Sequence, residues 1–159
     1  MLASGLVIPR YARLAGLAIM LAGVIGCGLV STTAPPATPA DFPGIASELS
    51  RRGILVDDIV SGNAGCPDED LARTAIRFTA SGFDQAQATP LYLYIFRNRE
   101  AFQRRRPDVD RCLASYVHDP DSFGLIEAPP FVLVGPGPWA PDFAAELRRG
   151  LTAAAGNGG

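Results

Sequence analysis

The stretch Leu91-Tyr92-Leu93-Tyr94-Ile95-Phe96 forms the centre of the predicted sheet. Its residues are β-forming and apolar at every position, which is typical of a strand covered on both faces. Because successive side chains point to opposite faces, one face holds Leu91, Leu93 and Ile95, and the other holds Tyr92, Tyr94 and Phe96. An aromatic row on an open sheet can bind a ligand, but we expect this row to pack beneath helices or loops.

Further strands are predicted on both sides of this stretch, from residues typical of strands between turn signals. They cover residues 54–60, 123–128 and 131–135. Residues 71–80 fit a helix or a strand, because their apolar residues match both periodicities. We favour one helical turn followed by a strand, since residues 81–89 would then connect a hairpin to the central strand. Pro129-Pro130 is expected to limit regular pairing between the last two strands.

Three helices are predicted from apolar residues at helical spacing. The first begins after Asp41 and ends at Gly53, the second begins after Asn98, and the third runs from about Pro141 to Ala154. Pro107 either starts a second section of the middle helix or kinks it. The element order predicts an α+β domain with a mainly antiparallel sheet of about five strands and about three helices largely on one face.

The N-terminal segment has the three parts of an export signal. Arg10 and Arg13 supply positive charge, residues 14–25 form an apolar run, and Gly26 is the small residue at the cleavage point. The stretch Val24-Ile25-Gly26-Cys27 resembles the lipobox of bacterial lipoproteins, in which a branched apolar residue, a variable residue and a small residue precede an obligatory cysteine. This resemblance covers residues 1–27.

The lipobox resemblance implies cleavage before Cys27 and a diacylglycerol on its sulfur, and two acyl chains anchor a protein stably. The alternative is an uncleaved membrane helix, since the uncharged run continues through Val30. In both cases the arginine placement predicts that the rest of the chain is extracytoplasmic, anchored to the cell membrane. The mature chain resembles small, poorly characterised lipoproteins of GC-rich bacteria, a likeness that implies no activity.

The chain divides into four predicted parts. Residues 1–26 are the signal peptide, 27–40 the lipidated cysteine and a Pro/Thr-rich tether, 41–155 a single α+β domain, and 156–159 a disordered tail. A tether of this length reaches about 40 Å in polyproline II, which would hold the domain clear of the membrane.

Charge and composition exclude several function classes. Two of the fourteen arginines precede Cys27 and all sixteen acidic residues follow it, so the mature chain has a net charge of about −4. This balance argues against nucleic acid, which requires a basic surface. The chain has no lysine, which excludes a Schiff-base nucleophile and a Walker-type phosphate loop. We find no motif for a cofactor or a metal.

Two cysteines remain once Cys27 is assigned to lipid. Cys66 and Cys112 form an even pair in an exported domain, which predicts a disulfide. A redox or metal site would need closer cysteine spacing or more than the single histidine of the chain.

One histidine and one arginine cluster are the candidate functional residues. His118 lies beside Asp119 and near Asp121, but this segment has the composition of an exposed turn, and no hydrolase nucleophile motif accompanies it. The arginines surround the start of the second helix and could bind an anionic polymer, a lipid or a protein partner; they are Arg97, Arg99, Arg104, Arg105 and Arg106.

The sequence therefore favours a lipid-anchored, extracytoplasmic binding or interaction domain at the cell envelope that is not an enzyme. One alternative is a small envelope hydrolase that uses His118 with an acidic neighbour. Another is a structural accessory subunit, which would present an apolar patch on the face of Tyr92, Tyr94 and Phe96.

Overall fold

A computed structural model describes residues 42–115, 119 and 122–156. These residues form an α+β fold with one five-stranded antiparallel sheet, as predicted. The strands are β1 (Leu55–Ser61), β2 (Ala75–Gly82), β3 (Gln85–Ile95), β4 (Phe123–Ala128) and β5 (Phe131–Pro136). The helices are α2 (Phe42–Arg51), α3 (Glu69–Ala72), α4 (Arg99–Ala114) and α5 (Pro141–Gly156).

The central strand is β3, as the sequence predicted. The sheet order is β1-β2-β3-β5-β4, so β3 is hydrogen-bonded to β2 on one side and to β5 on the other. Its two faces contribute to separate cores. Leu91, Leu93 and Ile95 lie in one core, whereas Tyr94 and Phe96 lie in the other.

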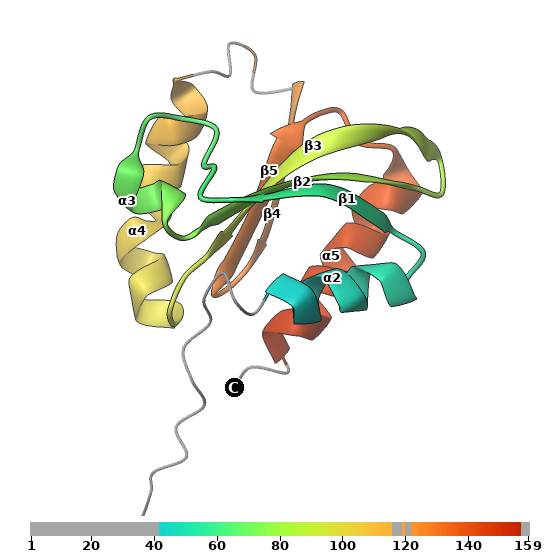
Figure 1. The fold of residues 1–159 in the computed structure, drawn as a ribbon, viewed down its shortest axis with the longest axis horizontal. Coiled ribbons are helices and arrows are strands. Elements are labelled where there is room, and N and C mark those ends of the chain that lie inside the picture. The colour runs from blue at the N-terminus through green and yellow to red at the C-terminus, as the bar shows by residue number, and fades with distance from the viewer. Residues whose placement is uncertain (1–41, 116–118, 120–121, 157–159) are drawn as a thin grey trace, which may run out of the picture. The chain divides into compact units, whose positions relative to one another are not determined.

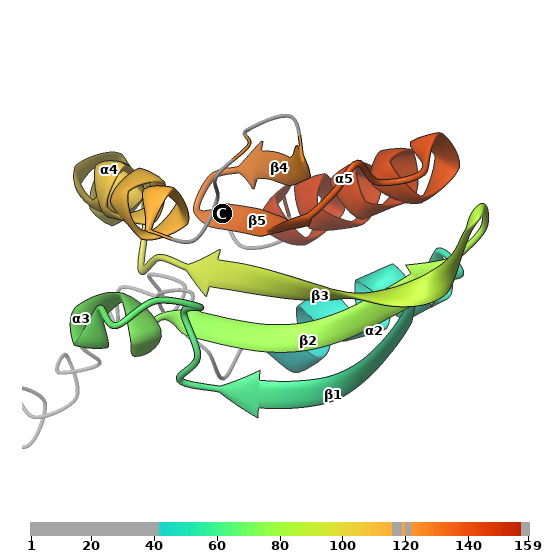
Figure 2. The same cartoon turned by 90° about the horizontal axis from the view of Figure 1, so that it is seen from above.

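Helices cover both faces of the sheet (Figures 1 and 2). Two of the three longer helices, α2 and α5, pack on the face of Leu93, where Phe42, Leu49, Phe143 and Leu147 are buried. The helices α3 and α4 pack on the opposite face, around Tyr94. The sequence predicted helices largely on one face and did not predict this second layer, because each apolar stripe shows that a helix is half-buried without showing against which face.

Residues 71–80 adopt the favoured arrangement. One turn of helix, α3, is followed by β2 from Ala75. The Asp68 side chain accepts a hydrogen bond from the amide of Leu71 at 2.8 Å and so caps α3. The first turn of α4 is capped in the same way, since the Asn98 side chain accepts from the amide of Ala101 at 2.8 Å.

Both hairpins differ from the sequence prediction. Pro129-Pro130, with a cis peptide bond, forms the turn between β4 and β5, and the two strands pair regularly from Phe123↔Pro136 to Ala128↔Phe131. The expected disruption is absent because both prolines lie in the turn, where their missing amide donors are not needed. The connection between β2 and β3 is shorter than the predicted 81–89, because β3 already begins at Gln85.

Pro107 neither divides nor ends α4, which runs without interruption from Arg99 to Ala114. The alternative of a second helical section is therefore wrong, although proline removes one helical hydrogen bond. Pro107 and Gln103, whose carbonyl loses that bond, are both exposed. Water can therefore bind this carbonyl.

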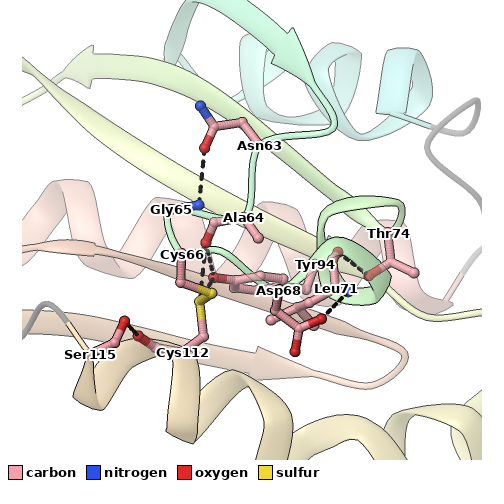
Figure 3. The surroundings of a disulfide bond; sticks show 10 residues. All are labelled: Asn63, Ala64, Gly65, Cys66, Asp68, Leu71, Thr74, Tyr94, Cys112 and Ser115. Atoms are coloured by element: carbon pink, nitrogen blue, oxygen red, sulfur yellow. Dashed lines mark hydrogen bonds between the residues drawn. A yellow bond between two sulfur atoms is a disulfide. The ribbon is translucent and has the colours of Figure 1, made fainter.

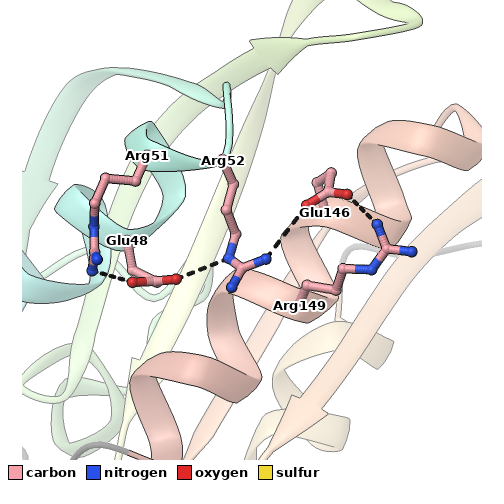
Figure 4. Close-up of polar contacts among 5 residues, drawn as sticks. All are labelled: Glu48, Arg51, Arg52, Glu146 and Arg149. Carbon is pink, nitrogen blue, oxygen red and sulfur yellow. Dashed lines mark hydrogen bonds and ion pairs between the residues drawn. The ribbon is translucent and has the colours of Figure 1, made fainter.

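An ion-pair network joins α2 to α5 (Figure 4). Glu48 is nearly buried, with 7% of its surface exposed, and pairs with Arg51 and with Arg52 at 2.9 Å. Arg52 also lies 3.7 Å from Glu146, which in turn pairs with Arg149. The buried carboxylate of Glu48 is thus neutralised, as a buried charge requires, and the two helices are linked by Arg52.

Asp84, in the turn between β2 and β3, caps α5. Its carboxylate accepts hydrogen bonds from the amides of Asp142 at 3.1 Å and Phe143 at 3.0 Å. The bond from Asp142 lowers the pKa of Asp84 most, burial acts in the opposite direction, and the bond from Phe143 lowers it further. A residue 58 positions away along the chain from Asp142 therefore accepts hydrogen bonds from the free amides at the start of this helix.

The Asp84 cap predicts a pH-dependent stability. Because the folded pKa is lowered, the contribution is fully present above the unfolded pKa of about 3.9 and is lost as pH falls through the folded value. We expect Asp84→Ala to lower the melting temperature at neutral pH, and this difference from the unchanged chain to shrink below about pH 4. Thermal unfolding followed by circular dichroism across this range checks it. Asp84→Asn keeps a hydrogen-bond acceptor and loses the charge. Its melting temperature at neutral pH should therefore lie between those of Asp84→Ala and the unchanged chain. A constant difference at all pH values would contradict the prediction.

Candidate functional site

The disulfide predicted from the cysteine count joins Cys66 to Cys112 (Figure 3). Their Cα atoms lie 5.6 Å apart, within the usual range for a disulfide. Cys66 lies in the segment between β1 and α3, and Cys112 lies on the buried side of α4. The bond therefore holds this segment against α4.

Tyr94, on β3, contacts the residues around the disulfide. Its side chain is fully buried, and its hydroxyl donates a hydrogen bond to the carbonyl of Ala64 at 2.7 Å. The same hydroxyl lies 3.7 Å from the sulfur of Cys112. Phe96 is also buried and meets the ring of Phe102 edge-on at 5.9 Å between centroids. Because Tyr94 and Phe96 pack inside the fold, they form neither an open ligand row nor an exposed apolar patch.

The five arginines of the candidate anionic-partner patch divide into two groups. Three are in ion pairs: Arg104 with Glu100, Arg105 with Asp108, and Arg106 with both Asp110 and Glu127. Arg97 and Arg99 are exposed and pair with no carboxylate among the described residues. Within this cluster, the arginines without an ion pair to a described residue therefore lie just before α4 and at its first residue.

Arg106 and Asp108 are held by opposite charges. For Arg106, burial lowers the pKa, but the hydrogen bonds that its guanidinium donates to Asp110 and Glu127 outweigh burial and raise the pKa. For Asp108, burial raises the pKa, whereas Arg105 and Arg111 lower it, with a lowered net result. Because Glu127 lies on β4, Arg106 connects α4 to the edge of the sheet. Part of the arginine cluster therefore stabilises the fold through intramolecular ion pairs.

Three of the residues singled out from the sequence lie outside the described residues. Cys27 belongs to residues 1–41, and His118 and Asp121 belong to the segment after α4. Asp119 is described, and its carbonyl accepts hydrogen bonds from the amide and the hydroxyl of Ser122. In the described part of the chain, no group of three or more His, Cys, Asp or Glu residues could hold a metal. No described helix is long and apolar enough to cross a membrane.

A second surface was missed by the sequence reasoning. Strand β1 is exposed along nearly its whole length, and three of its apolar residues, Leu55, Ile59 and Val60, are among the most exposed large apolar residues described. The signal was present in the adjacent acids Asp57 and Asp58, which interrupt the apolar run of this strand. Charges within a strand are typical of a sheet edge.

The described fold is thus that of a small α+β domain with a disulfide-held helix on one face and an exposed apolar edge strand. Comparison of the chain with protein-family models, curated proteins and solved structures found no match.

Proposed function

We propose that this protein is a lipid-anchored, extracytoplasmic binding domain at the cell envelope. The observation that carries the proposal is the disulfide between Cys66 and Cys112 in a chain that begins with a lipobox-like signal. Disulfides persist in oxidising compartments outside the cytoplasm. Compartment and anchor are therefore inferred from two separate features of the chain.

A binding role is favoured over catalysis by what the described surface offers. Its exposed features include an apolar edge strand and the neighbouring arginines Arg97 and Arg99, which form no ion pair with described residues. Surfaces of this kind contact other molecules without chemical steps. The contact is made within the distance from the membrane that the tether allows, up to about 40 Å.

The anchor is tested by Cys27→Ser. Loss of the sulfur removes the acceptor of the diacylglycerol. We therefore expect the detergent extract of the membranes to contain no cleaved, lipidated form of this variant. Intact mass of the extracted protein is the measurement, and the unchanged chain should match residues 27–159 plus diacylglycerol. The control is Cys66→Ala/Cys112→Ala, which should keep the lipid. Identical masses for the unchanged chain and Cys27→Ser, apart from the substitution, would refute the anchor.

The exposed arginines are proposed to contribute contact with an anionic envelope component. Reversal of both charges in Arg97→Glu/Arg99→Glu should weaken binding of the purified protein to vesicles rich in anionic lipid, measured by cosedimentation, by about thirtyfold if each arginine contributes about 1 kcal/mol. The matched control is the single reversal Arg148→Glu on α5, an exposed arginine that likewise forms no ion pair with a described residue, compared with Arg97→Glu alone. Equal cosedimentation of Arg97→Glu/Arg99→Glu and the unchanged chain would remove this patch from the proposal.

A further inference from the structure

Strand β1 presents a concentrated apolar surface at one edge of the sheet. The exposed fractions are 64% for Leu55, 53% for Ile59 and 44% for Val60. In the part of the chain that the structure describes, the other large apolar residues of comparable exposure are Phe83 and Leu125, which lie on different elements. Exposed apolar groups gathered in this way mark interaction sites.

The backbone of β1 is available along the same edge. One side of the strand pairs with β2 from Leu55↔Ser81 to Ser61↔Ile76. The other side has no partner strand among the described residues, since β1 is the first strand of the sheet. Unpaired amide and carbonyl groups on an edge are a template for an additional strand.

The register limits how long an added strand can be. It shifts between Asp57 and Val60, where β1 contains a bulge, and Asp58 has a φ of +51° within it. A bulge increases the local twist and interrupts regular pairing. A long, straight strand therefore fits this edge poorly, whereas a short extended segment fits on one side of the bulge.

Two carboxylates in the middle of β1 select the charge of that segment. Asp57 and Asp58 are exposed and form no ion pair with any described residue, although Asp58 accepts a hydrogen bond from the Thr79 hydroxyl at 3.3 Å. A second copy added antiparallel along this edge would bring the carboxylates of both copies together, which is destabilising. The tether of this chain has no charge and carries three prolines without amide donors. Neither is complementary to this edge.

We propose that β1 binds a short extended segment of a partner protein by strand addition. Apolar residues of the segment contact Leu55 on one side of the bulge or Val60 on the other, and its lysines or arginines pair with Asp57 and Asp58. This inference rests on the proposed binding function and gives the partner's chemistry as a short segment with apolar and basic residues. Its basis is the coincidence of an open edge, exposed apolar residues and carboxylates without ion pairs on one strand.

The test is an NMR titration of the full chain, extracted from bacterial membranes in detergent and labelled with ¹⁵N. The probe is a pentapeptide of alternating valine and lysine, and the comparison peptide of the same length alternates valine and glutamate. We expect the basic peptide to shift the amide signals of β1 and the adjacent part of β2. The same peptide methylated on every second backbone amide should bind less, because strand addition uses those amides. The acidic peptide should leave β1 unchanged.

Charge reversal supplies the second readout. Asp57→Lys/Asp58→Lys should weaken binding of the basic peptide by about thirtyfold, the effect of two exposed ion pairs near 1 kcal/mol each, and this variant should bind the acidic peptide instead. The matched control, Glu69→Lys/Asp70→Lys on α3, reverses an equally adjacent exposed pair and should change neither affinity.

Three outcomes would overturn the proposal: no shift of β1 with the basic peptide, equal binding of both peptides, or concentration-dependent shifts of β1 without peptide, which would identify a second copy as the occupant. None of them affects the mass of the extracted protein. Failure at β1 is therefore distinguishable from failure of the lipid anchor.

Discussion

Replacing Cys66 and Cys112 together with alanine is expected to lower the free energy of unfolding by about 4 kcal/mol. The bond joins residues 46 positions apart, so its removal releases a long loop in the unfolded chain and increases the entropy of that state. Since small domains are stable by about 5–15 kcal/mol, this is a large part of the total. Urea denaturation at constant protein concentration measures it.

The loss should be greatest around α4. This helix contributes a few buried side chains to its core, notably Phe102, Val109 and Cys112, and the disulfide holds it to the segment before α3. We therefore expect faster hydrogen exchange in α4 and in residues 62–68 than in α2 and α5. Reduction of the unchanged chain should reproduce the loss of stability and should not affect the variant. Equal urea midpoints for the variant and the oxidised chain would contradict the prediction.

The second large effect is expected for Phe78→Ala, with a loss of about 3–5 kcal/mol. Phe78 lies on β2, is fully buried, and its ring centroid is 5.4 Å from that of Phe42 on α2. Truncation removes apolar contacts on the α2 face of the sheet and leaves a cavity between strand and helix, which the surrounding residues fill only in part.

A matched control exists on the same hairpin. Phe83 is 54% exposed, so Phe83→Ala should change the free energy of unfolding by no more than about 0.5 kcal/mol. Urea unfolding of both variants, followed by circular dichroism, distinguishes the effect of removing a buried ring from the effect of removing an exposed one. Similar midpoints for the two variants would show that Phe78 does not carry the packing assigned to it.

Much of the fold could be predicted because its signals are local. The apolar residues on both faces of the stretch from Leu91 to Phe96 predicted a central strand, and the structure places β3 there. The two cysteines of the domain allowed one intramolecular pairing, and the structure contains it. Asn98 was identified as a helix start because an asparagine side chain can satisfy an amide three residues later, as it does here.

The candidate binding surface could be predicted only in part. The arginine cluster is visible as a charge run, but the sequence does not show that Arg106 reaches Glu127 on β4, 21 residues away. Likewise, Asp57-Asp58 hinted at an edge strand, whereas the exposure of Leu55 and Ile59 depends on which strand lies outermost. That order follows from pairings between distant segments.

The helices, the strands and the central strand with its two apolar faces could be predicted from the sequence, because side-chain periodicity and capping act within a few positions. The cysteine pair could be predicted because the domain contains two cysteines. The face that each helix covers, the capping of α5 by Asp84 and the position of β1 at an open edge were visible in the three-dimensional fold alone. These features arise from packing and hydrogen bonds between residues far apart in the chain. Several segments could pack against the same strand or helix, and the choice among them depends on the whole domain.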